Sequence, residues 1–459
     1  MRAVSTVAGG TARVLAALSA LTLACTEPQG IEPGLSGPAA AKPASGPTVS
    51  TAVPDNAPQD TTLEVRVLGT GFDQGSRVDL ALAGVPDPIN VHTNSTRFVT
   101  STELVANITI SPTATEARYD VIVTAATGKK GIGTERFLVR AVNDIGTLGG
   151  SGATARGVNA AGMIVGSSAD SSGYGQAFVW TETDGMRALP RRAGYNTASG
   201  YAINDAQIVV GVSGSAPVRW VPTGTGTWDV QELGGFGGTF GIAKAINATG
   251  VIVGYSEDAA GLSRPFRWTQ TGGMVALSVP SGEGYPSAIN GQGTIAGWYH
   301  PTGTDQRAIA WPASGGAVEL PPCSGGTMTT AYAINDADVI VGTCTRPGKR
   351  GTGGTFAARW LPDPAVPNTW LPAQVLTDPM GNLGGAAQSI NNAGEIVGDG
   401  GAFFWSEAQG FRALAILPLH ANGMGALGIN DASVGGTFRI VGNLNSSSGH
   451  AHAVWWPHP

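Results

Sequence analysis

The chain has 459 residues, of which 69 (15%) are glycine and 13% are charged. The averages in soluble proteins are about 7% for glycine and about 25% for charged residues. The net charge of −6 excludes a broadly basic nucleic-acid surface and a polybasic membrane patch. Hydrophobic residues make up 42%, which is enough for a core, and abundant glycine suits short strands joined by tight turns better than long surface helices. The composition therefore predicts an all-β protein.

The first 24 residues predict an export signal. Two arginines, Arg2 and Arg13, accompany an apolar run over residues 14–24, and a run of this length is too short to cross a hydrocarbon layer of about 30 Å as a helix. The run ends in Leu-Thr-Leu-Ala-Cys at 21–25, which resembles the lipoprotein box of exported bacterial proteins. The resemblance implies cleavage before Cys25, diacylation of that cysteine and attachment to a membrane through the lipid alone.

The residues after the signal indicate the location and a tether. Thr26 stands where an aspartate would be associated with inner-membrane retention, so the outer membrane or cell surface is the expected location. An ordinary secretory signal with an incidental cysteine is the alternative, and the protein would then be secreted. Residues 25–47 are rich in Pro, Ala, Gly and Ser, a composition that forms no core and predicts an extended tether.

Residues 48–140 consist of short runs in which apolar and polar residues alternate. Such alternation, broken by Gly, Pro, Asn and Asp, predicts half-buried strands of a small β-sandwich. The apolar positions are Leu63, Val65, Val67, Val78, Leu80, Leu82, Val121, Val123, Phe137 and Val139. The segments 69–72 (GTGF) and 119–124 (YDVIVT) resemble the immunoglobulin-like IPT/TIG domain. The resemblance implies a spacer or interaction module without chemistry of its own.

From residue 143 onward one unit occurs seven times. The unit is Ala-Ile-Asn-x-x-Gly-x-Ile-Val-Gly, a variable stretch, Ala-Phe-x-Trp and finally Gly-x-x-x-Leu. The copies are marked by Asn159, Asn204, Asn247, Asn290, Asn335, Asn391 and Asn430, by Gly166, Gly211, Gly254, Gly297, Gly342, Gly398 and Gly442, and by Trp180, Trp220, Trp268, Trp311, Trp360, Trp405 and Trp456. The unit predicts four strands, with the Asn-x-x-Gly turn between the first two. Four antiparallel strands in ~40–50 residues are typical of a β-propeller blade.

The two ends of the repeat region predict a closed ring. Ile145 precedes Asn159 by 14 residues, which is the spacing of a fourth-strand leucine, although no unit comes before it. The seventh unit ends at Trp456 without a fourth strand. A strand at residues 142–148 is therefore expected to complete the last blade and close a seven-bladed propeller over residues 141–459, which removes both exposed edges.

Two segments of the first unit, 144–150 (DIGTLGG) and 176–180 (QAFVW), resemble the extracellular HAF-repeat family. The resemblance covers the whole repeat region and implies an exported, surface-displayed protein, but it implies no reaction.

The tryptophan that recurs in each unit is expected to pack between neighbouring sheets, because a buried indole contributes a large contact area. Four tryptophans outside this register are candidates for exposed contact: Trp228, Trp298, Trp370 and Trp455. The stretch after the closing glycine varies in length among the units. The rim that carries these loops, opposite the Asn-x-x-Gly turns, is therefore expected to carry recognition.

Besides Cys25 the chain has two cysteines, Cys323 and Cys344, and an exported setting favours a disulfide between them. Two buried thiols or half of a metal site are the alternatives. The sequence contains no nucleophile elbow, phosphate loop, metal-binding motif or dinucleotide fingerprint. It accordingly predicts no catalytic residue, no metal and no cofactor, and it leaves the binding residues unknown.

Three functions remain open. The leading hypothesis is a monomeric, lipid-anchored surface protein that binds or adheres without catalysis, and that presents the variable propeller rim to an unidentified glycan or protein rather than to nucleic acid. The second is a structural or assembly component of the cell envelope. The third is a hydrolase or lyase on a propeller scaffold, since acid and base groups from separate blades leave no local sequence signature.

Overall fold

The computed structural model describes residues 46–457, with gaps at 60, 112–113, 116, 141, 225, 302–304, 349–352, 379–380, 383, 415–421, 432–438 and 446–449. The expected signal peptide, the lipidated Cys25 and the tether up to residue 45 lie outside these residues. The described residues form β-strands and no helix, which confirms the all-β prediction. A search of these same residues finds no helix with the length and apolar character that a membrane span requires.

The first part of the described chain is built from two sheets. Their orders are β1-β3-β7-β6 and β2-β9-β8-β4-β5, and β2 pairs with β9 in parallel whereas the other pairs are antiparallel. The strands are β1 (Thr48–Val53), β2 (Asn56–Pro58), β3 (Thr61–Thr70), β4 (Arg77–Leu82), β5 (Val85–Pro86), β6 (Val91–Thr100), β7 (Glu103–Ile110), β8 (Ala117–Thr124) and β9 (Lys130–Arg140). Apolar side chains of both sheets meet in one buried cluster that includes Val67, Leu104, Tyr119 and Phe137.

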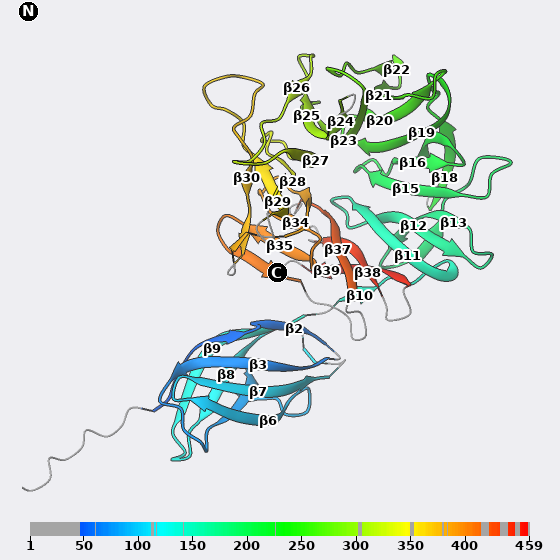
Figure 1. Cartoon of the computed structure of the whole chain (residues 1–459). Coiled ribbons are helices and arrows are strands. Elements are labelled where there is room, and N and C mark those ends of the chain that lie inside the picture. The colour runs from blue at the N-terminus through cyan, green and yellow to red at the C-terminus, as the bar shows by residue number, and fades with distance from the viewer. Residues whose placement is uncertain are drawn as a thin grey trace, which may run out of the picture. The chain divides into compact units, whose positions relative to one another are not determined.

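The second part contains seven four-stranded antiparallel sheets that follow one another around a ring (Figure 1). The first four sheets are β11 (Gly149–Val158), β12 (Ile164–Asp170), β13 (Gly175–Thr181), β14 (Gly185–Ala188); β15 (Ala198–Ile203), β16 (Val209–Ser213), β17 (Ala216–Gly224), β18 (Thr227–Glu232); β19 (Gly237–Ile246), β20 (Ile252–Asp258), β21 (Ser263–Thr269), β22 (Gly273–Ala276); and β23 (Glu283–Ile289), β24 (Ile295–His300), β25 (Arg307–Trp311), β26 (Val318–Glu319). Each sheet uses one copy of the repeated unit, in chain order.

The remaining three sheets are β27 (Met328–Ile334), β28 (Ile340–Arg346), β29 (Gly354–Trp360), β30 (Gln374–Val375); β33 (Ala387–Ile390), β34 (Ile396–Gly398), β35 (Phe403–Ser406), β36 (Gly410–Ala413); and β37 (Asn422–Ile429), β38 (Arg439–Asn445), β39 (Ala451–Pro457) with β10 (Asn143–Asp144). A small hairpin of β31 (Thr377–Asp378) and β32 (Gly381–Asn382) lies between the fifth and sixth sheets along the chain.

The last sheet is completed by the strand that precedes the first one. In β10, Asn143 pairs with Trp455 of β39, and the Ile145 N–H donates to the carbonyl oxygen of Ala453 at 3.0 Å. β10 is accordingly the edge strand next to β39 in the last sheet (Figure 1). The pairing expected for residues 142–148 is present, although the strand itself is only two residues long.

An arginine also joins the last sheet to the first. Arg439 of β38 has an exposed fraction of 4% and donates to the Gly162 carbonyl at 2.9 Å and to the Glu182 carboxylate at 2.6 Å. Its guanidinium lies 5.3 Å from the ring centroid of Trp180 and 4.6 Å from that of Trp455. Charge-assisted hydrogen bonds and cation–π contacts together stabilise the junction between the two ends of the repeat region.

A ring of hydrogen bonds links all seven sheets. The first strand of each sheet ends directly before the asparagine of the unit, and all seven asparagines are buried. Each side-chain amide donates to the backbone carbonyl of the next asparagine at 3.1–3.4 Å, and the seventh donates to the first. Each side-chain oxygen accepts an N–H from its own turn at 2.8–3.0 Å. We call this closed set the asparagine ring.

The recurrent tryptophans pack as expected. Trp220, Trp360 and Trp456 are fully buried, and Trp180, Trp268 and Trp311 have exposed fractions below 10%. Trp405 is the half-buried member of the set. These indoles belong to the apolar clusters that fill the space between neighbouring sheets, which confirms the packing prediction.

Candidate functional site

The first strand of every sheet is irregular at the same place. The pairing register shifts around the residue three positions before the ring asparagine, so that this residue has no direct partner on the second strand. Such a bulge redirects a side chain and increases the local twist. The seven bulge residues are Arg156, Tyr201, Lys244, Ser287, Tyr332, Gln388 and Leu427.

All seven bulge residues line one cavity of about 580 Å³, which we call the central cavity. Its wall is completed on one side by Tyr255, Tyr285, Pro286, Trp298 and His300. A volume of this size and a lining of aromatic side chains with a few polar groups are typical of small-molecule sites. One side chain from each of seven sheets therefore converges on a single space around the ring axis.

The central cavity extends away from the asparagine ring. Asn290 forms the turn between β23 and β24. Tyr285 lies near the start of β23 and His300 at the end of β24, so both are far from that turn. Both residues line the cavity. The cavity thus reaches toward the rim formed by the variable loops, which is the rim on which the sequence predicts recognition.

Two cations contact the same tyrosine ring in this cavity. The guanidinium carbon of Arg156 lies 4.9 Å and the ammonium of Lys244 4.3 Å from the centroid of the Tyr201 ring. Among the ion pairs of the described residues, neither cation has an acidic partner. The Nη1 atom of Arg156 is buried and donates to none of the described protein atoms.

Burial lowers the pKa of Lys244 to about 8, and the neighbouring charge of Arg156 acts in the same direction. Desolvation disfavours the charged ammonium, and a like charge adds repulsion. The pKa values of the tyrosines shift upward instead. Burial raises the pKa of Tyr255 to about 12 and also raises the pKa of Tyr332. At neutral pH the cavity therefore presents two positive charges and uncharged phenol groups.

An aromatic cluster forms the wall beside β23 and β24. The rings of Tyr285 and Trp298 are stacked, with centroids 4.2 Å apart and an interplanar angle of 19°. Tyr255 meets Tyr285 edge-on at 5.0 Å, and His300 meets Trp298 edge-on at 5.2 Å. Tyr285 also donates its hydroxyl to Glu283 at 3.1 Å, which helps to fix the ring. The cluster is a rigid aromatic surface next to the two cations.

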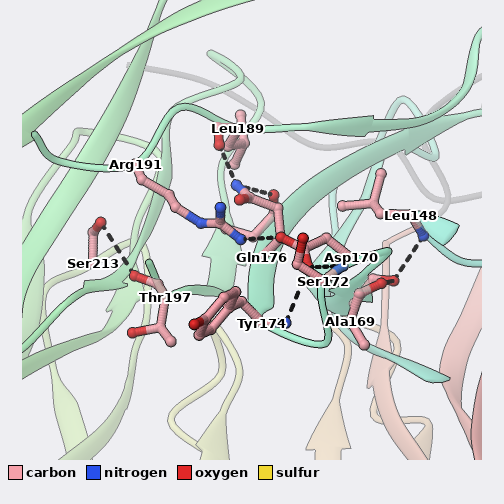
Figure 2. A network of polar contacts seen from close by, with 12 residues as sticks. Leu148, Ala169, Asp170, Ser172, Tyr174, Gln176, Leu189, Arg191, Thr197 and Ser213 are labelled. Atoms are coloured by element: carbon pink, nitrogen blue, oxygen red, sulfur yellow. Dashed lines mark hydrogen bonds and ion pairs between the residues drawn. The ribbon is translucent and has the colours of Figure 1, made fainter. Parts of the chain in front are cut away.

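Two turns on the rim toward which the central cavity extends are each held by an aspartate. Figure 2 shows one of them, in which Asp170 accepts the N–H groups of Ser172 at 2.9 Å and Tyr174 at 3.0 Å and an Arg191 N–H at 2.7 Å. These bonds, the one from Arg191 above all, hold the pKa of Asp170 below its usual range. Asp258 caps the corresponding turn of the third sheet in the same way. An aspartate thus holds the turn of the first sheet and the turn of the third sheet in the same way.

The cysteine pair predicted from the sequence is joined in the structure. Cys323 and Cys344 form a disulfide with their Cα atoms 6.1 Å apart. Both are buried in the apolar cluster of the fifth sheet, together with Trp360 and Trp370, and neither lines the central cavity. In the part of the chain that the structure describes, no three His, Cys, Asp or Glu side chains gather as metal ligands.

The four tryptophans proposed for exposed contact have different positions. Trp298 lines the central cavity. Trp228 and Trp455 are half-buried, with the indole N–H of Trp228 donating to Gln207 and the ring of Trp455 lying under an arginine. The expectation for Trp370 is wrong, because this residue has an exposed fraction of 5% and donates to the Asp338 carbonyl at 2.8 Å. The long segment of the fifth unit folds back and carries this indole into the core.

One position of the repeated unit marks the residues that line the central cavity, although regular strand alternation would place it on a different face. The position three residues before the asparagine is the one place in the otherwise constant entry segment where the seven copies differ in chemistry. Strict strand alternation would place it on the same face as the residue directly before the asparagine, such as Ile203, which is buried in the core. The bulge breaks that alternation, and periodicity alone does not predict a bulge.

No family model matches the chain, and no curated protein matches it. The solved structures that are similar include a streptogramin B lyase (10% identity, TM-score 0.38, 70% of this chain and 97% of that one), a virginiamycin B lyase from Staphylococcus aureus (11%, 0.38, 70% and 100%) and a DUF4784 family protein from Bacteroides caccae (11%, 0.27, 89% and 95%). These similarities are too low to bear on the activity of this chain.

Proposed function

We propose that residues 143–457 form a seven-bladed β-propeller of HAF-like repeats and that residues 48–140 form an immunoglobulin-like sandwich of the IPT/TIG type. The propeller is supported by the seven four-stranded sheets and by the asparagine ring that links each sheet to the next. The sandwich is supported by its two sheets with one shared core and by the sequence segments that resemble that domain.

In this proposal the protein is a binding protein that takes a ligand into the central cavity and releases it unchanged. The single observation that carries this function is the convergence of the seven bulge residues on one cavity. The scaffold around them repeats from sheet to sheet, whereas the seven side chains differ in charge, size and hydrogen-bonding groups. A constant frame that presents varied side chains to one space is how rigid folds carry recognition.

The remaining part of the proposal concerns location. An export signal over residues 1–24, a lipid on Cys25 and a Pro-rich tether would hold the binding domain outside the cell, at the outer membrane or the cell surface. Incorporation of labelled lipid into the wild-type chain, and its loss in Cys25→Ala, would support this location. Equal labelling of both chains would contradict it.

Binding is tested with the fluorescently labelled full-length protein on an array of glycans that covers common sugars and linkages. We expect selective binding, and an at least tenfold loss of it in Trp298→Ala, since Trp298 lines the central cavity. Tyr174→Ala removes an aromatic ring of 46% exposed fraction outside the cavity and is the matched control. The bound glycan should be recovered intact after incubation. A silent array together with an envelope protein that co-purifies with the chain would favour the assembly role instead.

A further inference from the structure

The two cations of the central cavity lack a counter-charge among the described residues. Arg156 and Lys244 come from different sheets, contact the same Tyr201 ring and repel each other. A buried polar atom without a partner costs the folded protein free energy unless something else satisfies it, and Nη1 of Arg156 has no partner among the described atoms. A bound anion would satisfy it and would screen the repulsion between the two cations at the same time.

The kind of anion follows from the two donors. A guanidinium offers a planar fork that matches the two oxygens of a carboxylate, and an ammonium adds a compact charge that accepts many directions of approach. Because both cations contact the same Tyr201 ring and line the same cavity, one acidic group of a ligand can lie within reach of both. A single carboxylate at this position would accept from both residues.

The rest of the cavity indicates what carries the carboxylate. The Tyr285–Trp298 stack gives an apolar surface, while Ser287, Gln388 and the uncharged phenol of Tyr332 offer hydrogen-bond donors and acceptors around it. A ligand with C–H faces and many hydroxyl groups satisfies both kinds of wall, and the space of about 580 Å³ accommodates sugar residues.

We propose, building on the binding function above, that the central cavity recognises an acidic saccharide, with the carboxylate of a sugar acid held by Arg156 and Lys244 and its ring placed against the Tyr285–Trp298 stack. The ligand class is thus a glycan chain or chain end that contains a uronic or similar sugar acid. Specificity for the acid comes from the first and third sheets, the aromatic stack of the fourth sheet contacts the sugar ring, and the remaining bulge residues select among acidic sugars.

The test uses titration calorimetry with the full-length chain and pairs of oligosaccharides that differ only in the acid group. Oligogalacturonides are compared with galactose oligomers of the same length, and glucuronate-containing oligomers with their glucose counterparts. A sulfated oligomer is a third arm, because sulfate shares the charge but not the planar shape of a carboxylate. We expect the carboxylated member of at least one pair to bind at least tenfold more tightly than both its neutral and its sulfated counterpart.

Variants assign this preference to the two cations. Lys244→Met and Arg156→Met should each remove the preference for the acid, and Lys244→Arg should retain most of it because the charge is kept. Arg187→Met is the matched control, since this arginine pairs with Asp184 on an outer strand away from the cavity. Thermal unfolding of each variant verifies that it is folded.

Three results would overturn the assignment in different ways. If neutral and acidic members bind equally and Trp298→Ala weakens both, the cavity binds saccharides but the carboxylate site is wrong. The carboxylate site is also wrong if the sulfated oligomer binds best. If no saccharide of either kind binds, the saccharide-binding function and the carboxylate site fail together.

Discussion

The side-chain amide of Asn430 donates to the backbone carbonyl of Asn159 at 3.1 Å, across 271 residues of chain. The same bond joins every other pair of neighbouring sheets over separations of 39 to 56 residues. The ring asparagine therefore acts twice, since it also accepts an N–H within its own turn. One residue type at one repeat position sets both the turn and the contact to the next sheet.

Replacement of a ring asparagine should destabilise the whole ring. In Asn430→Ala or Asn247→Ala, the carbonyl of the next asparagine and one turn N–H lose their partners in a buried setting. We expect each variant to lose about 1–3 kcal/mol of unfolding free energy, measured by urea denaturation. Gln270→Ala, which shortens an exposed amide side chain, is the control and should change stability by less than ~0.5 kcal/mol. A wild-type midpoint in both ring variants would contradict the role of the asparagine ring.

The glycine that closes the second strand of each unit should not tolerate alanine. A Cβ atom added to Gly254 would overlap the carbonyl oxygen of Ile242, which belongs to the bulged first strand, and Gly166 faces Thr154 in the same way. The backbone cannot move aside without disturbing the sheet pairing on both sides. Gly254→Ala should therefore cost at least ~3 kcal/mol or prevent folding.

Gly175→Ala is the matched control for this substitution. Gly175 lies in a third strand with no positive backbone φ, and among the described atoms only the Ala198 carbonyl oxygen, at 4.0 Å, lies near an added Cβ. Soluble expression and the unfolding midpoint should stay close to wild type in this variant. Similar losses in both glycine variants would show that the cost is general to strands and not specific to the bulge.

The sequence predicts the strand order, the antiparallel sheets and the contact between residue 145 and the last unit, because these follow from motif spacing and strand polarity. It does not predict the side chains that meet at the centre. Periodicity gives Lys244 the same face as Ile246, yet Ile246 is buried between sheets and Lys244 lines the cavity, since Lys244 is itself the bulge residue. The bulge depends on twist and on the carbonyl that faces Gly254, and these are properties of the assembled sheet.

The position of Trp370 is a second feature that the sequence does not predict. It lies outside the repeat register, so the local pattern gives no inward direction for it. The segment 361–371 folds back on itself, since the N–H of Leu371 donates to the carbonyl of Leu361, and the Trp370 indole packs in the cluster around Cys323. Such packing of an irregular segment depends on long-range contacts that no short sequence motif encodes.

The disulfide should stabilise the fifth sheet. Cys323 and Cys344 close a loop of 21 residues, for which chain entropy predicts a contribution of about 3 kcal/mol. Reductant should lower the unfolding midpoint of the wild-type chain and leave a Cys323→Ala/Cys344→Ala double variant unchanged. Peptide mass mapping without reduction should find the two cysteines in one linked fragment. Two unlinked peptides would favour the alternative of buried free thiols.

Lys244 should reduce stability at neutral pH. Burial lowers its pKa from the usual 10.5 to about 8 in the folded chain, so between these values the unfolded chain binds more protons than the folded one. Stability then rises with pH through that window, and below about pH 8 the charged lysine imposes its full cost. Lys244→Met should therefore be more stable than wild type at pH 7, by on the order of 1–3 kcal/mol.

The pH dependence separates this effect from packing. Urea unfolding of both chains at pH 7 and pH 9.5 should show the advantage of Lys244→Met shrinking at the higher pH, because wild type alone gains stability there. An acidic ligand should reverse the order, since its charge favours the protonated lysine and it binds the folded state. A constant difference between the two chains at both pH values would mean that the methionine acts through packing alone. In that case burial would not destabilise the charged ammonium of Lys244, and the attraction for an anion would have to come from Arg156.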